Sequence, residues 1–141
     1  MKKNNADITV IIPAYNEEKG LEPTIRELRE VLEDPRYLVV DGNSIDKTVE
    51  IAKQMGADVV VQNGKGKGRA LAQALEHVNS DTLYVVFIDA DYTYPAKSIP
   101  EMIDILEKNP RVGMVTANRF KQRFVLKKAM NDVYYFGNRF L

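Results

Sequence analysis

The chain has 141 residues, 45% of them hydrophobic and 28% charged, a balance typical of one globular domain with a sizeable core. Twenty basic and twenty acidic side chains cancel, so the overall charge gives no reason to expect a nucleic-acid partner. The absence of cysteine excludes disulfides and thiolate metal sites.

The first half of the chain predicts strands and helices in alternation. Residues 1–7 lack the apolar stretch of a signal peptide, and the apolar run over residues 8–16 predicts a strand covered on both faces. A helix is then predicted, because apolar residues recur at three- and four-residue steps from Leu21 to Leu32, and Asn16 is expected to cap it. Residues 37–44 predict a second strand, followed by a short helix closed by Gly56.

The second half continues this alternation. Strands are predicted over residues 57–64, 82–89 and 112–119, separated by helices that begin near Ala70 and Ser98. A last helix is expected from one apolar stripe, formed by Leu126, Met130, Val133, Tyr134 and Gly137. No apolar run approaches the roughly 20 residues that span a bilayer. The order predicts an α/β three-layer sandwich with a mainly parallel sheet, built as one domain over residues 1–141.

In such folds, ligands bind beyond the carboxyl ends of the strands, so the residues after each strand are the candidates for function. Asp89 and Asp91 follow the apolar run Val85–Ile88 at a spacing that lets both carboxylates reach one site. Carboxylate oxygens are the ligands that Mg²⁺ prefers, with waters and phosphate oxygens in the remaining positions. The alternative is that the two acids only cap the turn that follows.

A glycine-rich basic segment follows the third predicted strand. Gly64, Gly66 and Gly68 alternate with Lys65 and Lys67, and Arg69 comes next. Glycine lets the backbone approach a ligand closely, and the helix that follows would direct its N-terminus at an anion. The spacing matches neither the phosphate loop of nucleotide triphosphatases nor the dinucleotide fingerprint. The alternative is a flexible basic surface loop.

Two acids flank the turn after the second predicted strand. Asp41 comes directly off the strand and is the better ligand candidate. Asp46 is interpreted as a cap of the next helix.

Four segments, in order, resemble the successive motifs of family 2 glycosyltransferases with the GT-A fold: VIIPAYNEE, VVDGNSIDKT, GKGKGRA and FIDADYTYP. They cover nearly the whole chain. Within the family, the pattern is most similar to that of polyprenyl (dolichyl) phosphate glycosyltransferases such as dolichol-phosphate mannose synthase.

The resemblance implies a role for each matching position. Asp41 would hold the base or ribose, Asp89 the ribose or metal, and Asp91 the Mg²⁺ or Mn²⁺ that carries the diphosphate of a nucleotide-sugar donor. Two further groups would bind the nucleotide: the loop of Pro13, Ala14, Tyr15 and Glu17, and the segment Gly64, Lys65, Gly66, Lys67, Gly68 and Arg69. One departure weakens the base contact, because the family commonly has Asp-Asp-Gly-Ser where this chain has Asp41-Gly42-Asn43-Ser44.

The expected reaction is metal-dependent transfer of a sugar, with inversion, from GDP-mannose, UDP-glucose or UDP-GlcNAc to a polyprenyl phosphate. A hydroxyl acceptor would need a carboxylate base, and no acid after Asp91 is a convincing one, whereas a phosphate acceptor needs only cations. Arg119, in the basic stretch after the fifth predicted strand, is the candidate for the acceptor phosphate. The other explanation for the missing base is that it lies in a C-terminal acceptor region, into which such enzymes usually continue.

Two alternative functions stay open: transfer to a saccharide hydroxyl, and a nucleotide-binding module without turnover. A receiver-type signalling domain is disfavoured because it would have paired acids after the first strand, where this chain has Pro13-Ala14-Tyr15-Asn16. We expect a cytoplasmic location, with peripheral contact to the cytoplasmic face of a membrane where the acceptor is a lipid.

Overall fold

The computed structural model describes residues 7–117 and 134–137. The chain divides into two compact units, Met1–Lys97 and Ser98–Leu141, and each is described by itself. The expectation of one domain over residues 1–141 stays a prediction.

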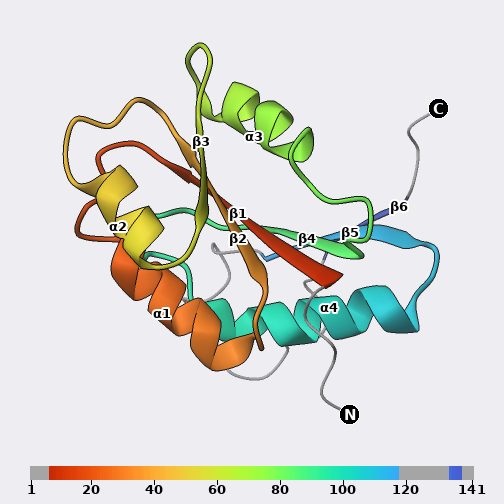
Figure 1. Cartoon of the computed structure of the whole chain (residues 1–141). Helices are drawn as coiled ribbons and strands as arrows, with labels where there is room; N and C mark the ends of the chain where they lie inside the picture. The colour runs from red at the N-terminus through yellow and green to blue at the C-terminus, as the bar shows by residue number, and fades with distance from the viewer. Residues whose placement is uncertain (1–6, 118–133, 138–141) are drawn as a thin grey trace. The chain divides into compact units, whose positions relative to one another are not determined.

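The first unit is built on a sheet of four parallel strands (Figure 1). The strands are β1 (Ile8–Ala14), β2 (Arg36–Asp41), β3 (Asp58–Val61) and β4 (Tyr84–Phe87), in the spatial order β3-β2-β1-β4. The central strand β1 is almost wholly buried, which explains why its sequence is a continuous apolar run rather than an alternating one. Because the strands are parallel, all four end at the same edge of the sheet.

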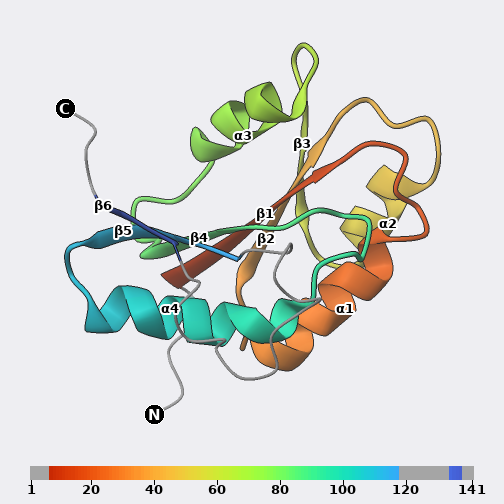
Figure 2. The same cartoon turned by 180° about the vertical axis from the view of Figure 1, so that it is seen from behind.

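Three helices cover the two faces of this sheet: α1 (Leu21–Val31), α2 (Thr48–Gln54) and α3 (Lys67–Leu75). Parallel strands joined through a helix make right-handed crossovers. The first two crossovers run from β1 outward to β3, and the third returns past β1 to β4. α1 and α2 therefore lie on one face and α3 on the other (Figures 1 and 2).

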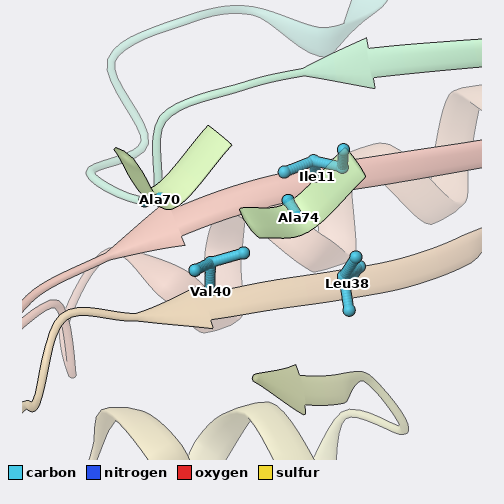
Figure 3. Close-up of a cluster of buried hydrophobic side chains, with 5 residues drawn as sticks. All are labelled: Ile11, Leu38, Val40, Ala70 and Ala74. Atoms are coloured by element: carbon cyan, nitrogen blue, oxygen red, sulfur yellow. The ribbon is translucent and has the colours of Figure 1, made fainter. Parts of the chain in front are cut away.

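The core under α3 is a small cluster of fully buried side chains (Figure 3). Ile11 of β1 lies in register with Leu38 of β2, and Val40 is two residues further along β2 on the same face. Ala70 and Ala74, one turn apart on α3, pack against these side chains. Their small size lets the helix lie close to the strands, so the start of α3 is held at the carboxyl edge of the sheet.

The start of α1 differs from the prediction. The helix begins at Leu21, its N-cap residue is Gly20, and no side chain caps it, so the expectation that Asn16 caps this helix was wrong. Asn16 has a left-handed backbone with φ of 53°, and its side-chain oxygen accepts a hydrogen bond from the N–H of Ile45. Its side chain therefore joins two loops instead of ending a helix.

The second unit contains α4 (Ile99–Lys108), β5 (Val112–Thr116) and β6 (Tyr134–Gly137), preceded by a short 3₁₀ turn over Ala96–Ser98. β5 confirms the fifth predicted strand, but it pairs antiparallel with β6 in a separate two-stranded sheet. The predicted last helix was wrong at Tyr134–Gly137, where aromatic residues favour a strand and β5 supplies the partner. The rest of that predicted helix lies outside the described residues.

The predicted α/β class with a parallel sheet is confirmed. Over the described residues, no helix combines the length and the apolar character needed to cross a bilayer.

Candidate functional site

The candidate site lies at the carboxyl edge of the parallel sheet in the first unit. Strand order reverses between β1 and β4, which makes this edge the expected ligand crevice of a doubly wound sheet. Four segments follow the strands here. They are called the first loop (15–20), the second loop (42–47), the glycine-rich loop (62–66) and the acidic loop (88–95).

Hydrogen bonds join the first loop to the second loop and to the start of α2. Three successive backbone N–H groups of the first loop donate to side chains beyond β2: Asn16 to Ser44 Oγ at 2.8 Å, Glu17 to Thr48 Oγ1 at 2.8 Å, and Glu18 to Asp46 Oδ2 at 3.1 Å. Sequence reasoning did not predict Ser44 or Thr48 as partners. Serine and threonine are common in loops and at helix starts, so their presence does not reveal which distant N–H group their hydroxyl will bind.

Asp46 has the capping role that was interpreted from the sequence. Its Oδ1 atom accepts hydrogen bonds from the N–H of Thr48 at 2.9 Å and from the Thr48 hydroxyl at 2.5 Å, and α2 begins at Thr48. These bonds, together with that from the N–H of Glu18, lower the pKa of the Asp46 carboxyl although partial burial opposes them. The formal N-cap residue is Lys47, one position later than predicted.

Asp41 is the last residue of β2, and only 2% of its surface is exposed. Its carboxylate accepts a hydrogen bond from the N–H of Ser44, at 3.1 Å and 3.3 Å to its two oxygens. Next to it, a Cβ on Gly42 would lie 3.3 Å from Tyr15 Cβ and 3.4 Å from Ala14 O. These contacts are tight, so a side chain at position 42 would require Tyr15 or the backbone of Ala14 to shift slightly.

The glycine-rich loop turns through two glycines in left-handed conformations. Gly64 has φ of 96° and Gly66 φ of 97°, which other L-residues rarely adopt. The Gln62 side chain donates to Gly66 O at 2.8 Å, and the Arg69 side chain lies against Gly64. No side chain caps the start of α3, so its first N–H groups are oriented as an anion site would require.

The glycine-rich segment and the acidic loop are joined by an ion pair. The ammonium group of Lys67 lies against Asp89 Oδ1, with 58% of the Lys67 side chain and 29% of the Asp89 side chain exposed. Two motifs that were predicted separately are therefore in contact.

Asp91 also has the structural role that was weighed as its alternative. Its Oδ1 atom accepts hydrogen bonds from the N–H of Thr93 at 3.1 Å and from the Thr93 hydroxyl at 2.6 Å. The Asp91 side chain is nevertheless exposed at the edge, and neither acid lies within β4, which ends at Phe87. The prediction that their two-residue spacing in a strand brings both carboxylates to one site therefore rests on a wrong strand end, because both acids lie in the loop that follows β4.

Glu17 shows how the acids gather at this edge. Partial burial raises the pKa of its carboxyl above the ordinary value, and the negative charges of Asp91, Asp46 and Asp89 raise it further. The negative charges of these three aspartates therefore disfavour the charged form of Glu17, a condition that a bound cation would relieve. Within the part of the chain that the structure describes, no three or more acidic or histidine side chains are grouped closely enough to hold a metal by themselves.

The donor set at this edge fits a hard divalent cation. Asp89 and Asp91 supply carboxylate oxygens, and the Lys67 ammonium already places one positive charge against Asp89. One or two carboxylates, completed by phosphate oxygens and waters, is the usual arrangement for Mg²⁺ in proteins.

The remaining candidate residues occupy varied positions. Pro13 and Ala14 are the last two residues of β1, and Ala14 is buried, so they present mainly backbone to the edge. Tyr15 is 62% exposed above Gly42. Lys65 is exposed in the glycine-rich loop and Gly68 lies in the first turn of α3. Arg119 lies outside the described residues.

Similarity to known proteins identifies the family of the chain. A family model described as "Glycosyl transferase family 2" matches residues 9–141. The chain is 39% identical over 113 residues to "Protein RfbJ" of Shigella flexneri, covering 80% of this chain and 85% of that protein. It is 32% identical over 113 residues to the "Dolichyl-phosphate hexose transferase" of Haloferax volcanii, covering 80% of this chain and 48% of that enzyme.

Solved structures show the same fold. Glucosyl-3-phosphoglycerate synthase from Mycobacterium tuberculosis, in complex with Mn²⁺, UDP and glucosyl-3-phosphoglycerate, superposes with a TM-score of 0.63 at 30% identity, covering 74% of this chain and 41% of that one. The same synthase has also been solved with Mg²⁺ and UDP. The expected GT-A fold is therefore confirmed. The chain spans less than half of the length of this synthase and of the Haloferax transferase.

Proposed function

The chain belongs to glycosyl transferase family 2, and from this premise we propose that it transfers a sugar from a nucleotide-sugar donor to a polyprenyl phosphate, with a divalent metal and with inversion. One observation above all supports the donor site: the Lys67–Asp89 ion pair, which places the glycine-rich segment against the acidic loop at the edge where the sheet order reverses.

In this proposal, the nucleoside lies beside the first and second loops. Asp41 is buried and fixed by the N–H of Ser44, so it offers a rigid oxygen acceptor for a base or ribose hydroxyl. Tyr15 presents an exposed ring above Gly42. Pro13, Ala14 and Glu17 complete this side of the proposed donor site through their backbone and the Glu17 carboxyl.

The diphosphate lies between the glycine-rich loop and the acidic loop. Lys65, Lys67 and Arg69 provide positive charge, and the uncapped N-terminus of α3 provides backbone N–H donors. Gly66 and Gly68 keep that backbone accessible, since no atom lies within 4 Å of a Cβ built on either, whereas the Arg69 side chain lies against Gly64. Asp89 and Asp91 would hold Mg²⁺ or Mn²⁺, which when bound supplies charge that stabilises the departing diphosphate.

The acceptor half of the proposal depends on the chemistry of the nucleophile. A lipid phosphate is already an anion and needs no general base, whereas a hydroxyl needs one. The similarity to a dolichyl-phosphate hexose transferase supports the lipid phosphate. Arg119 is proposed to bind that phosphate. A cytoplasmic location, with contact to the cytoplasmic face of a membrane, is part of the same proposal.

Transfer to a hydroxyl acceptor is the second candidate. The similarity to a synthase whose crystals hold glucosyl-3-phosphoglycerate favours it. In that case Glu17 is the described acid at the edge best suited to accept a proton, because its raised pKa lies closer to neutral pH than that of an ordinary glutamate.

The test is thermal unfolding of the chain with a panel of UDP- and GDP-sugars, each with Mn²⁺ and with chelator. A ligand that binds only the native state, present at 100 times its Kd, stabilises it by about 2.7 kcal/mol. We expect a metal-dependent rise in Tm with one nucleotide, lost in Asp91→Asn. That substitution keeps the size of the side chain and an oxygen for Thr93 while removing the charge.

Asp81→Asn is the matched control, because Asp81 is exposed and precedes β4, at the opposite end of that strand. Wild-type donor affinity in Asp91→Asn would refute the metal assignment. Incubation of the preferred donor with polyprenyl phosphate or with phosphoglycerate then separates the acceptors, since only the first gives an organic-extractable sugar product.

A further inference from the structure

The glycine at the start of α1 lies in contact with the backbone of the acidic loop. A Cβ at Gly20 would lie 2.4 Å from Ala90 O, 2.8 Å from Asp91 Cα and 3.0 Å from Asp91 C. All three are backbone atoms, so no side-chain rotation can make room. The residue between Asp89 and Asp91 therefore rests directly on the first loop.

Backbone conformation does not explain why this residue is glycine. Gly20 has φ of −94° and ψ of −30°, which every residue adopts readily. What the position requires is space for the acidic loop. Ala90 is 2% exposed, between an Asp89 that is partly exposed and an Asp91 that is exposed. The two carboxylates thus extend from a short segment whose centre is fixed by packing.

Thr24, one turn into α1, adds a polar contact to the same point. It is 2% exposed, and its hydroxyl donates to Gly20 O at 2.8 Å. Ala90 O lies 3.5 Å from the same hydroxyl, at the outer limit of a hydrogen bond. Gly20 O, Ala90 O and Thr24 Oγ1 therefore form one buried group beneath the two acids.

We propose that Gly20 and Thr24 are positioning residues for the metal: they set the separation and direction of the Asp89 and Asp91 carboxylates without touching the cation. The inference rests on the proposed function, because it assumes that these carboxylates hold the metal. Divalent cations bind well only when their ligands are held in place. In catalytic sites, a displacement of about 1 Å can lower the rate on the order of 100-fold. A methyl group at position 20 forces a displacement of that kind.

The test measures Mn²⁺ affinity in the presence of UDP by electron paramagnetic resonance, and UDP affinity in chelator by calorimetry. We expect Gly20→Ala to weaken Mn²⁺ binding by about tenfold or more and to leave metal-free UDP affinity within about twofold of wild type. Lys19→Ala, an exposed neighbour on the same loop, is the control and should match wild type in both.

Thr24 provides a second pair of variants, which decides the matter if Gly20→Ala does not fold. Thr24→Val keeps the shape but removes the hydroxyl, and we expect about threefold weaker Mn²⁺ binding; Thr24→Ser should restore it. Wild-type Mn²⁺ affinity in both Gly20→Ala and Thr24→Val, or an equal loss of UDP affinity in chelator, would overturn the inference. If the wild-type chain itself shows no Mn²⁺-dependent UDP binding, the proposed function is refuted, and with it the inference that depends on it.

Discussion

At the scale of single residues, Lys67 has two possible anionic partners. Its ammonium lies against Asp89, where a metal ligand is proposed. A bound diphosphate, proposed to lie between the glycine-rich loop and the acidic loop, would offer the second partner. If the proposed site is correct, Lys67 would compete with the cation for Asp89 when no donor is bound and would help to bind the donor diphosphate.

Lys67→Ala should therefore have opposite effects on two affinities. Without nucleotide, Mn²⁺ should bind about two- to fivefold more tightly, the range expected for loss of an exposed ion pair, while UDP should bind more weakly when Mn²⁺ is present. Manganese titrations with and without UDP measure both. Lys65→Ala serves as comparison, because it removes the same charge from the same segment without breaking the ion pair; equal nucleotide-free Mn²⁺ affinity in the two variants would contradict the idea.

The sequence predicts some residues of the site better than others. Asp89 and Asp91 were predicted because two carboxylates directly after an apolar strand, two positions apart, form a pattern typical of a Mg²⁺ site. Gly20 was not, since a glycine before a helix has an ordinary explanation in local conformation, and its true reason is a contact with Ala90. Gly20 and Ala90 are far apart in the sequence, and neither periodicity nor composition of a single sequence indicates such a contact.

At the scale of elements, the first two loops behave as one unit because Thr48 joins them. Its hydroxyl accepts from the N–H of Glu17 and donates to Asp46 Oδ1, and the residue is fully buried. Both partners belong to segments proposed to surround the donor. Removing this hydroxyl would leave a polar N–H group without its acceptor.

Thr48→Val, which preserves shape, should lower the free energy of unfolding by about 1–3 kcal/mol, the cost of an unsatisfied buried polar group. Urea denaturation at neutral pH measures it. Thr48→Ser keeps the hydroxyl and should recover most of the loss. If the serine variant is as unstable as the valine variant, packing of the methyl group is the cause and the hydrogen bonds are not.

Helices and strands were predicted well where a single hydrophobic pattern dominates the segment. The buried stripe of α1 and the apolar strands of the parallel sheet follow directly from periodicity. The error at Tyr134–Gly137 came from applying a helical period to residues whose partner is β5. Helical spacing and strand propensity conflict there, and only the pairing decides between them.

At the scale of the whole molecule, a net charge of zero hides an uneven distribution. Several acids lie at the carboxyl edge. The pKa of Glu17 is raised there, first by partial burial and then by the negative charges of Asp91, Asp46 and Asp89. An acid whose pKa is raised on folding favours the folded state most when protonated. That stabilisation is present below pH 4.5, the ordinary value, and is lost as pH rises through the raised pKa.

Glu17→Gln keeps a neutral side chain at every pH and should be modestly more stable than wild type at pH 7 in chelator. The advantage should shrink as pH falls and vanish below the ordinary pKa of glutamate. Urea midpoints between pH 4 and 7.5 test this, with Glu30→Gln, an exposed acid on α1, as comparison. A difference that does not change with pH would mean that the carboxyl charge is not responsible.

The fold class was predictable as a whole because alternating strands and helices admit few arrangements, and the family because four motifs occur in order. The contacts that assemble the site were not. Asn16 with Ser44, Lys67 with Asp89 and Gly20 with Ala90 each join segments that the sequence presents as separate.

The place of β1 in the sheet has a consequence for how the chain acquires its shape during synthesis. β1 is synthesised before the other three strands of its sheet, yet it lies between β2 and β4, and one of its edges stays unpaired until residues 84–87 follow. Until then the nascent chain has an open strand edge, the kind of surface that invites mispairing. The acidic loop is the last of the four loops to be synthesised, and it meets Gly20 only when this sheet is complete, so the proposed cation site would form late, once the first unit has folded.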